Sequence, residues 1–310
     1  MKKATLLLLL ISALTYGQNY VDLVKIGYGQ SFNNDFEGTV NSTQIKSFEA
    51  DITFPLVLNE KSAFITGFSF SRNNQQLFPE EPFISLYSTT LKAGISHVFD
   101  EKYSTTVVFL PKIASDYNGI SGDDFYFGGY GLFKIHKSER LIYRFGAYAS
   151  SEAFGIFATP IFGWYYLSDN GRFEMDMALP ISADINYCMG VTTIGMDYFG
   201  IGRSFNLSNE NVPQGFSDLY TDLSALEFST YVQFNVMKSV LLRAKFGYTS
   251  TDYELYTQGE KIDLGLSAFS FGDDRTQVNP NINGGLFLKF EAVYRFRIPA
   301  KNEEIETPTD

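Results

Sequence analysis

The segment from Gly285 to Phe296 alternates between a face that is apolar throughout and a face that is mostly charged. One face carries Leu286, Leu288, Phe290, Ala292, Tyr294 and Phe296, and the other carries Phe287, Lys289, Glu291, Val293 and Arg295. Side chains of a β-strand point to alternate faces, so the segment has one apolar face and one mostly charged face. The pattern recurs along the chain, and no helical stretch is predicted to cover the apolar faces.

The same alternation predicts strands in twelve segments that are separated by turn residues. They are residues 21–30, 44–58, 63–71, 86–99, 103–113, 125–136, 141–150, 155–167, 172–179, 221–236, 240–256 and 285–296. Short polar turns alternate with longer loops, as in outer-membrane barrels, which have short periplasmic turns and longer external loops. We therefore expect an all-β fold, a transmembrane antiparallel up-and-down β-barrel with both ends of its wall at the periplasm.

The strand number depends on residues 172–205. Phe173, Met175, Met177 and Leu179 alternate well, but Pro180 interrupts the pattern. A short hairpin followed by a strand would give about 14 strands, and a periplasmic excursion followed by a strand would give about 12, both within the range of such barrels. We expect about 12 strands.

Three domains of very different size are expected. Residues 1–17 have the basic start, short apolar core and small residues of a secretory signal, and the apolar core is shorter than the roughly 20 residues of a spanning helix. Residues 18–298 form the barrel. Residues 299–310 are acidic, lack apolar periodicity and are expected to be a disordered periplasmic tail.

Composition supports an exported membrane barrel. Aromatic residues make up 16% of the chain, with 30 Phe and 20 Tyr, which suits two interfacial girdles. The net charge of −11 becomes −13 without Lys2 and Lys3, so the chain lacks the clustered cations that bind nucleic acid. A secreted β-sandwich also shows alternating strands, but many runs here have 10 or more residues, as spanning strands of roughly 9–11 residues require.

The terminal segment resembles the assembly signal of outer-membrane β-barrel proteins of diderm bacteria. Polar Lys289 is followed by the aromatic residues Tyr294 and Phe296. Two features differ, since Glu291 takes the usual glycine position and residues 297–310 follow the strand. Within this class the chain is most similar to a barrel family of uncharacterised function. The resemblance implies the fold, an outer-membrane location, contact with outer-membrane lipid and insertion by the barrel-assembly machinery, but no substrate.

The predicted registers place a set of charged side chains on the inner face. The candidate lumen charges are Lys25, Glu49, Asp51, Arg243, Lys245, Lys289, Glu291 and Arg295. Pairing of the last strand with the first would bring the basic members together, beside Glu49 and Asp51. Such a field can select polar solutes in a channel, but the same charges can also form a salt-bridged plug in a narrow barrel.

Other chemistry has weaker support. Only His97 and His136 could act as a base toward a serine, and both are predicted near periplasmic strand ends, so we expect no enzyme. Gly122-Asp123-Asp124 and Gly272-Asp273-Asp274 lack a full calcium-ligand spacing, so neither a metal nor a cofactor is expected. Trp164 and one neighbouring tyrosine are expected in the periplasmic girdle.

Two functions follow from these expectations. The first is a passive channel or transporter for small polar solutes. The second is a non-transporting surface or envelope-interaction barrel with a plugged lumen. The external loop from Thr257 to Asn283 contains the apolar run Leu264–Phe271, which is expected either to plug the lumen or to dock on another subunit.

Overall fold

The computed structural model describes residues 20–32, 34–213, 215–267 and 269–297. The predicted signal (1–17) and the predicted tail (299–310) lie outside these residues. None of the helices in the described part of the chain is long and apolar enough to cross a membrane.

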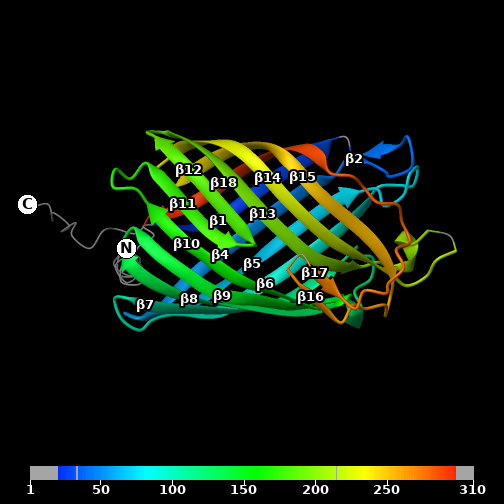
Figure 1. The fold of residues 1–310 in the computed structure, drawn as a ribbon, viewed down its shortest axis with the longest axis horizontal. Coiled ribbons are helices and arrows are strands. Elements are labelled where there is room, and N and C mark those ends of the chain that lie inside the picture. The colour runs from blue at the N-terminus through cyan, green and yellow to red at the C-terminus, as the bar shows by residue number, and fades with distance from the viewer. Residues whose placement is uncertain (1–19, 33, 214, 268, 298–310) are drawn as a thin grey trace, which may run out of the picture.

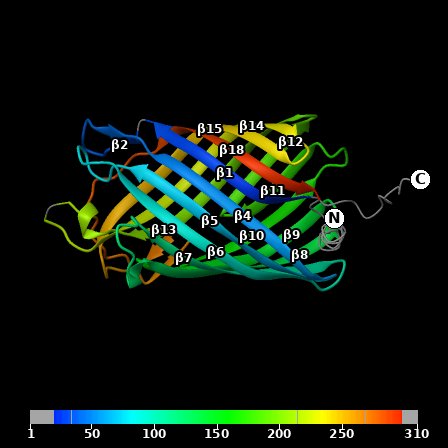
Figure 2. The same cartoon turned by 180° about the vertical axis from the view of Figure 1, so that it is seen from behind.

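In these residues fourteen antiparallel strands close into one barrel (Figure 1). They are β1 (Tyr20–Phe32), β4 (Lys46–Asn59), β5 (Ser62–Gln75), β6 (Ile84–Val98), β7 (Tyr103–Ser115), β8 (Phe125–Ser138), β9 (Leu141–Glu152), β10 (Gly155–Leu167), β11 (Phe173–Leu179), β12 (Ser182–Met189), β13 (Thr192–Asn206), β14 (Leu219–Met237), β15 (Val240–Thr257) and β18 (Gly285–Arg297). Each strand pairs with the next along the chain, and β18 pairs with β1, as predicted. Figure 2 shows β1, β4, β5 and β6 side by side on the opposite wall.

The remaining elements lie in the longer connections. They are the short strands β2 (Asn34–Asp35), β3 (Ser42–Thr43), β16 (Leu264–Leu266) and β17 (Phe269–Phe271) and the 3-10 helices η1 (Gly122–Asp124) and η2 (Asn209–Asn211). The short turns β4–β5, β6–β7, β8–β9, β10–β11, β12–β13 and β14–β15 lie at the end of the barrel where Tyr20 pairs with Arg297, which we call the turn end. The opposite end, the loop end, carries the longer connections and the two-residue turn between β9 and β10.

The expected number of about 12 strands is wrong, and the alternative of about 14 is correct. Residues 172–205 fold as a hairpin, β11–β12, followed by the strand β13. Pro180 and Ile181 form the tip of the hairpin, so the proline that interrupts the alternation marks a turn. The excursion that we preferred does not exist, because β10 pairs with β11 and β12 pairs with β13.

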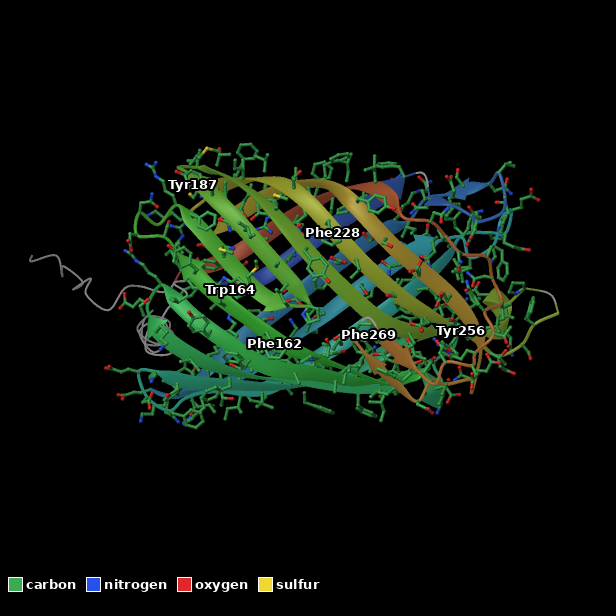
Figure 3. The ribbon with its side chains drawn as sticks, viewed as in Figure 1. Phe162, Trp164, Tyr187, Phe228, Tyr256 and Phe269 are labelled. Atoms are coloured by element: carbon green, nitrogen blue, oxygen red, sulfur yellow. The ribbon has the colours of Figure 1, made fainter. Side chains whose placement is uncertain are left out.

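The apolar faces of the strands point away from the barrel, as predicted. On β18, Phe290 is 61% exposed, whereas its inward neighbour Glu291 is 3% exposed. Figure 3 labels Phe162, Trp164, Tyr187 and Phe228 on the strands that face the viewer. On β10 the outward apolar residues extend from Ile156 to Tyr166, and ten steps of about 3.3 Å tilted by roughly 45° span about 23 Å. This height matches the apolar band of roughly 25 Å on outer-membrane barrels.

The outer ends of three strands leave the wall and cross the lumen. At the loop end of β13, Asn206 bridges to Ser115 of β7, which lies six strands away around the barrel. Nearby, Arg203 Nη1 donates a hydrogen bond to Ser71 Oγ of β5 at 2.9 Å. The adjoining ends of β14 and β15 follow β13 inward, because β14 pairs with β13 along fifteen residues.

These inward ends fill the loop end of the lumen with a hydrophobic cluster, which we call the mouth cluster. Its buried members are Phe36, Ile45, Leu77, Leu86, Ala114, Tyr126, Phe205, Leu207, Leu219, Leu223, Ala225, Tyr253, Leu255 and Ile282. They come from opposite walls and from the external loops, so side chains rather than water occupy this level of the barrel. The lumen is therefore closed at the loop end within the described residues.

Candidate functional site

Below the mouth cluster the barrel encloses a cavity of about 1410 Å³, which we call the main lumen. Its lining runs from Tyr20, Arg295 and Arg297 at the turn end to Phe154 and Phe157 near the loop end. All eight predicted lumen charges line it, because period-two alternation fixes the face of every residue in a correctly registered strand.

The carboxylate of Glu291 is the centre of the charge network. Its side chain is completely buried, and three cations lie close to it. Lys25 Nζ and Lys245 Nζ are each 3.1 Å from its Oε1, and Arg243 Nη1 is 3.7 Å from its Oε2. The strand pairing explains this arrangement, because β18 lies between β1 and β15 and its inner face meets theirs.

Lys289 forms a second node two residues earlier on β18. Its Nζ lies 3.1 Å from Glu49 Oε2 of β4 and 3.2 Å from Glu227 Oε2 of β14. Lys245, which is opposite Lys289 on β15, also pairs with Asp197 of β13. The predicted basic residues therefore lie side by side, but carboxylates from four strands are interleaved with them.

The guanidinium of Arg243 connects this network to the hairpin. Its Nη1 lies 3.5 Å from Asp184 Oδ2 of β12, and its Nη2 donates a hydrogen bond to Gln233 Oε1 at 2.8 Å. It also stacks over the ring of Tyr231 at 4.2 Å, and the Tyr231 hydroxyl donates to Asp184 Oδ1 at 2.7 Å. Sequence reasoning missed Asp184 because its strand was not assigned.

The other candidate charges have partners elsewhere on the wall. Asp51 pairs with Lys92 at 2.6 Å, and Arg295 pairs with Asp22 at 2.6 Å beside the ring of Tyr20. Lys112 pairs at 2.7 Å with Glu152, a buried carboxylate that the sequence did not single out. Each of the eight predicted charges thus has an opposite charge within ion-pair distance.

The charged wall ends at a break between β10 and β13, which we call the side window. The hairpin β11–β12 is short, so its tip at Pro180 and Ile181 lies partway up the barrel, on the side facing the viewer in Figure 1. At the level of the tip, Phe162 is the last residue of β10 that pairs with β11, and Phe199 is the last residue of β13 that pairs with β12. Beyond these two residues, no described strand of the hairpin lies between β10 and β13.

The window is bounded above and partly covered. Above it, Ser204 of β13 donates from its backbone N and its Oγ to Glu152 Oε2, at 2.8 and 2.9 Å. The free edge of β10 pairs in parallel with β16, where Phe157 meets Gly265 and Ala158 meets Leu266. Within the apolar run, Leu264–Leu266 and Phe269–Phe271 therefore form a ribbon, β16–β17, on the wall beside the window. The expectation that the run plugs the lumen is wrong for these residues, because they extend the wall, whereas docking on another subunit stays a prediction.

The main lumen reaches the window. Its lining includes Thr159, Pro180, Ile181, Gly200 and Gly202 at the margins of the break. It also includes Phe157 of β10, Leu226 on the outer face of β14, and Ile262 and Phe269. The last two belong to the segment formed by Ile262 and the ribbon β16–β17, which we call the cover. Phe269 is 68% exposed, so the cavity lining extends to a residue on the outside of the molecule (Figure 3).

The remaining candidates for chemistry lie away from this cavity. Ser62 Oγ lies 2.8 Å from His97 Nδ1, and Ser104 Oγ lies 2.9 Å from His136 Nε2. Neither pair is part of the lining of the main lumen. Each serine is a cross-strand neighbour that the sequence did not connect to the histidine, since pairing between strands decides that contact.

The paired carboxylates of the loops take part in structural contacts. Asp124 accepts from the backbone N of Ser121 at 2.6 Å and from Asn206 Nδ2 at 3.0 Å. Asp273 forms a bidentate contact with Arg275, whose Nε and Nη2 donate to Oδ1 and Oδ2 of the carboxylate, each at 2.9 Å. Among the described residues, no group of three or more His, Cys, Asp or Glu side chains is arranged to hold a metal ion.

Comparison with known proteins gives the fold alone. No protein-family model matches the chain, and no curated protein matches it. Among solved structures, the COG4313 outer membrane channel from Pseudomonas putida F1 has a TM-score of 0.45 and 10% identity, covering 91% of this chain and 98% of that one. The KdgM porin in complex with disordered oligogalacturonate has a TM-score of 0.36 and 8% identity, covering 88% and 99%. A TodX monoaromatic hydrocarbon channel mutant has a TM-score of 0.37 and 9% identity, covering 89% and 91%.

Proposed function

We propose that the protein is an outer-membrane β-barrel that serves as a passive channel for small polar solutes. The main lumen carries this proposal, because it is a cavity of about 1410 Å³ lined along its length by charged and polar side chains. The apolar belt of about 23 Å supports the membrane location. The longer connections at the loop end support the orientation that we propose, with the turn end in the periplasm and the loop end outside.

The charge network would control what the lumen admits. Fixed cations and carboxylates that line a narrow water-filled path favour polar solutes and discriminate by charge. Because the pairs are interleaved, the wall offers many hydrogen-bonding groups with little excess of either sign. We expect weak ion selectivity that depends on the balance around Glu291.

We also propose that the protein acts without catalysis. The two Ser–His pairs lie outside the lining of the main lumen, so they lack the enclosed binding site that a hydrolase requires. The partners that we propose are outer-membrane lipid along the belt and the assembly machinery at the terminal strand, whose apolar face is fully outward.

One observation favours a second function, a non-transporting envelope barrel. The mouth cluster closes the loop end with fourteen buried apolar residues, four of which are less than 1% exposed. A barrel that is closed at this level could serve as a surface for partners rather than as a pore.

Single-channel conductance separates the two functions. The refolded mature protein, residues 18–310, would be compared in planar bilayers with a Leu223→Ala variant, whose substitution loosens the mouth cluster. Current steps in the unaltered protein show that its lumen is filled with water and support the channel. Steps in the variant alone show that the mouth cluster closes the native lumen and favour the second function. If both fold, shift on heating in gels and remain silent, the lumen is closed throughout and the second function is favoured.

A further inference from the structure

The outer face of β13 changes from large apolar residues to small and polar residues at the level of the hairpin tip. Toward the turn end its outward residues are Ile194, Met196 and Tyr198, and Ile194 and Met196 are exposed on the outside of the barrel. Beyond the tip the same face carries Gly200, Gly202, Ser204 and Asn206. Small and polar residues replace large apolar ones where the strand leaves the wall, so this part of β13 is not built to face lipid tails.

The space between this face and the cover is lined by both polar and apolar groups. Phe157 projects from β10 toward β13, since a Cβ on Gly202 would lie 3.6 Å from its ring. Phe154, Ile262 and Leu226 add apolar surface. Thr159, Ser182, Ser224 and Ser270 add hydroxyl groups to the same lining.

The outside of the window lies within the apolar belt. Phe162 below it, Phe228 beside it and Phe269 on the cover are all exposed on the outer surface. Ile156 is 60% exposed and lies above the level of Phe162 on the same strand, so the belt continues past the window toward the loop end. A molecule that leaves the lumen through this break would therefore enter lipid rather than water.

From these observations we propose that the side window is the membrane-facing entrance of the lumen. It would admit amphipathic molecules, each with an apolar body and a small polar head, between the outer leaflet and the periplasmic end. The mouth cluster blocks the direct route to the outside, and the mixed lining of the window matches a ligand with one apolar and one polar part. This inference rests on the proposed function, because it requires an open lumen.

A reporter cysteine just inside the window tests the route. Cys188 is the one cysteine of the chain, so Cys188→Ser with Ser182→Cys places a single thiol on the inner side of the hairpin tip. The protein would be held in lipid nanodiscs, which leave both membrane faces accessible. Two probes would be compared, pyrene maleimide dissolved in the lipid and a disulfonated maleimide that stays in water.

Two variants in this background change the window in opposite directions. Gly202→Trp fills the space, because its Cβ meets only the Phe157 ring, at 3.6 and 3.7 Å. Phe157→Ala widens it. Gly131→Trp is the matched control, since it adds the same side chain to a glycine of β8, two strands away from β10, where a Cβ meets only Val107 at 4.0 Å.

We expect both probes to label the parent protein. Gly202→Trp should cause loss of labelling by pyrene maleimide, and Phe157→Ala should accelerate it, while labelling by the aqueous probe stays unchanged. Gly131→Trp should alter neither rate. If Gly202→Trp fails to fold, the direction of the Phe157→Ala effect decides the question.

The two possible failures are distinct. If the aqueous probe labels the parent but the lipid probe does not, or if the window variants leave the lipid probe unaffected, the side entrance is wrong and the channel stands. If the aqueous probe does not reach position 182 in the parent, the lumen is closed, and both the proposed function and the side entrance fail.

Discussion

Replacing Glu291 by Gln should destabilise the barrel substantially, although it changes only one atom and one charge. The buried carboxylate attracts Lys25 and Lys245 at 3.1 Å and Arg243 at 3.7 Å. With an effective dielectric constant of roughly 20, these contacts are worth about 5, 5 and 4 kcal/mol before desolvation is subtracted. Desolvation of buried ions costs several kcal/mol each, so the net effect is much smaller than this sum.

The other partners of the three cations reduce the cost further. Lys245 keeps Asp197, and Arg243 keeps Asp184. The side chain of Lys25 is 42% exposed, so it can turn toward water in the lumen. Removing one member of a buried ion pair costs about 3–5 kcal/mol, and we expect Glu291→Gln to fall near the lower limit, at about 3 kcal/mol.

Urea unfolding of the protein in lipid vesicles measures this change. Trp164 is the one tryptophan of the chain, so its fluorescence reports the transition without another label. The matched control is Asp169→Asn, which breaks a shorter pair, 2.8 Å from Arg140, whose aspartate is fully exposed. We expect no measurable shift there, since exposed pairs contribute little. Equal midpoints for the two variants would refute the reasoning, because burial rather than distance is the basis of the predicted difference.

Three further predictions follow. Joint replacement of Arg243 and Lys245 by Gln leaves the charge of Glu291 in excess, so the reversal potential in a salt gradient should shift toward cation selectivity, and an unchanged potential would contradict the role of the network. Leu223→Ala should cost about 2–5 kcal/mol in urea unfolding because Leu223 is buried in the mouth cluster, and a cost below that range would show that the cluster is loosely packed. The hydrogen bonds from Arg275 hold the pKa of Asp273 below its usual value. The pair therefore stabilises the loop fully at pH values above the usual carboxyl pKa, and this stabilisation is lost as the pH falls through the lowered pKa. Hydrogen exchange of residues 272–277, corrected for intrinsic rates, should show this acid-dependent loosening in the native protein and not in Asp273→Asn.

The alternation of apolar and polar side chains predicted most strands of the wall, because the two-residue period of a β-strand repeats several times in every long strand. It failed at β11 and β12, which have 7 and 8 residues and leave little room for a pattern to repeat. The outward residues of β12 include Ala183 and Ile185, and its inward residues include Ser182 and Asp184, so the contrast in polarity is also weak. A proline between two short runs can mark either a turn or the end of a strand, and pairing with neighbouring strands decided the question.

The sequence predicted which side chains of the site point into the lumen, but it did not predict which of them pair with one another. The face of Lys289 or Glu291 follows from position along one strand, whereas the partner of Glu152 depends on where β13 crosses the lumen. That crossing was not predicted, although the sequence contains a signal for it. The change from Ile194 and Met196 to Gly200 and Gly202 on one face marks the point at which lipid no longer covers the strand.

The short hairpin also gives the barrel a taper. Fourteen strands surround the lumen at the turn end, and the two strands of the hairpin stop partway, so twelve continue toward the loop end. Because barrel diameter grows roughly in proportion to strand number, the wall narrows by about one seventh at this level. The width of the wall at this level is then a property of hairpin length rather than of any lining side chain. Lengthening β11 and β12 by two residues each would keep every side chain on its face and move the narrowing toward the loop end, which offers a way to adjust the width of the lumen below the mouth cluster while leaving the charge network unchanged.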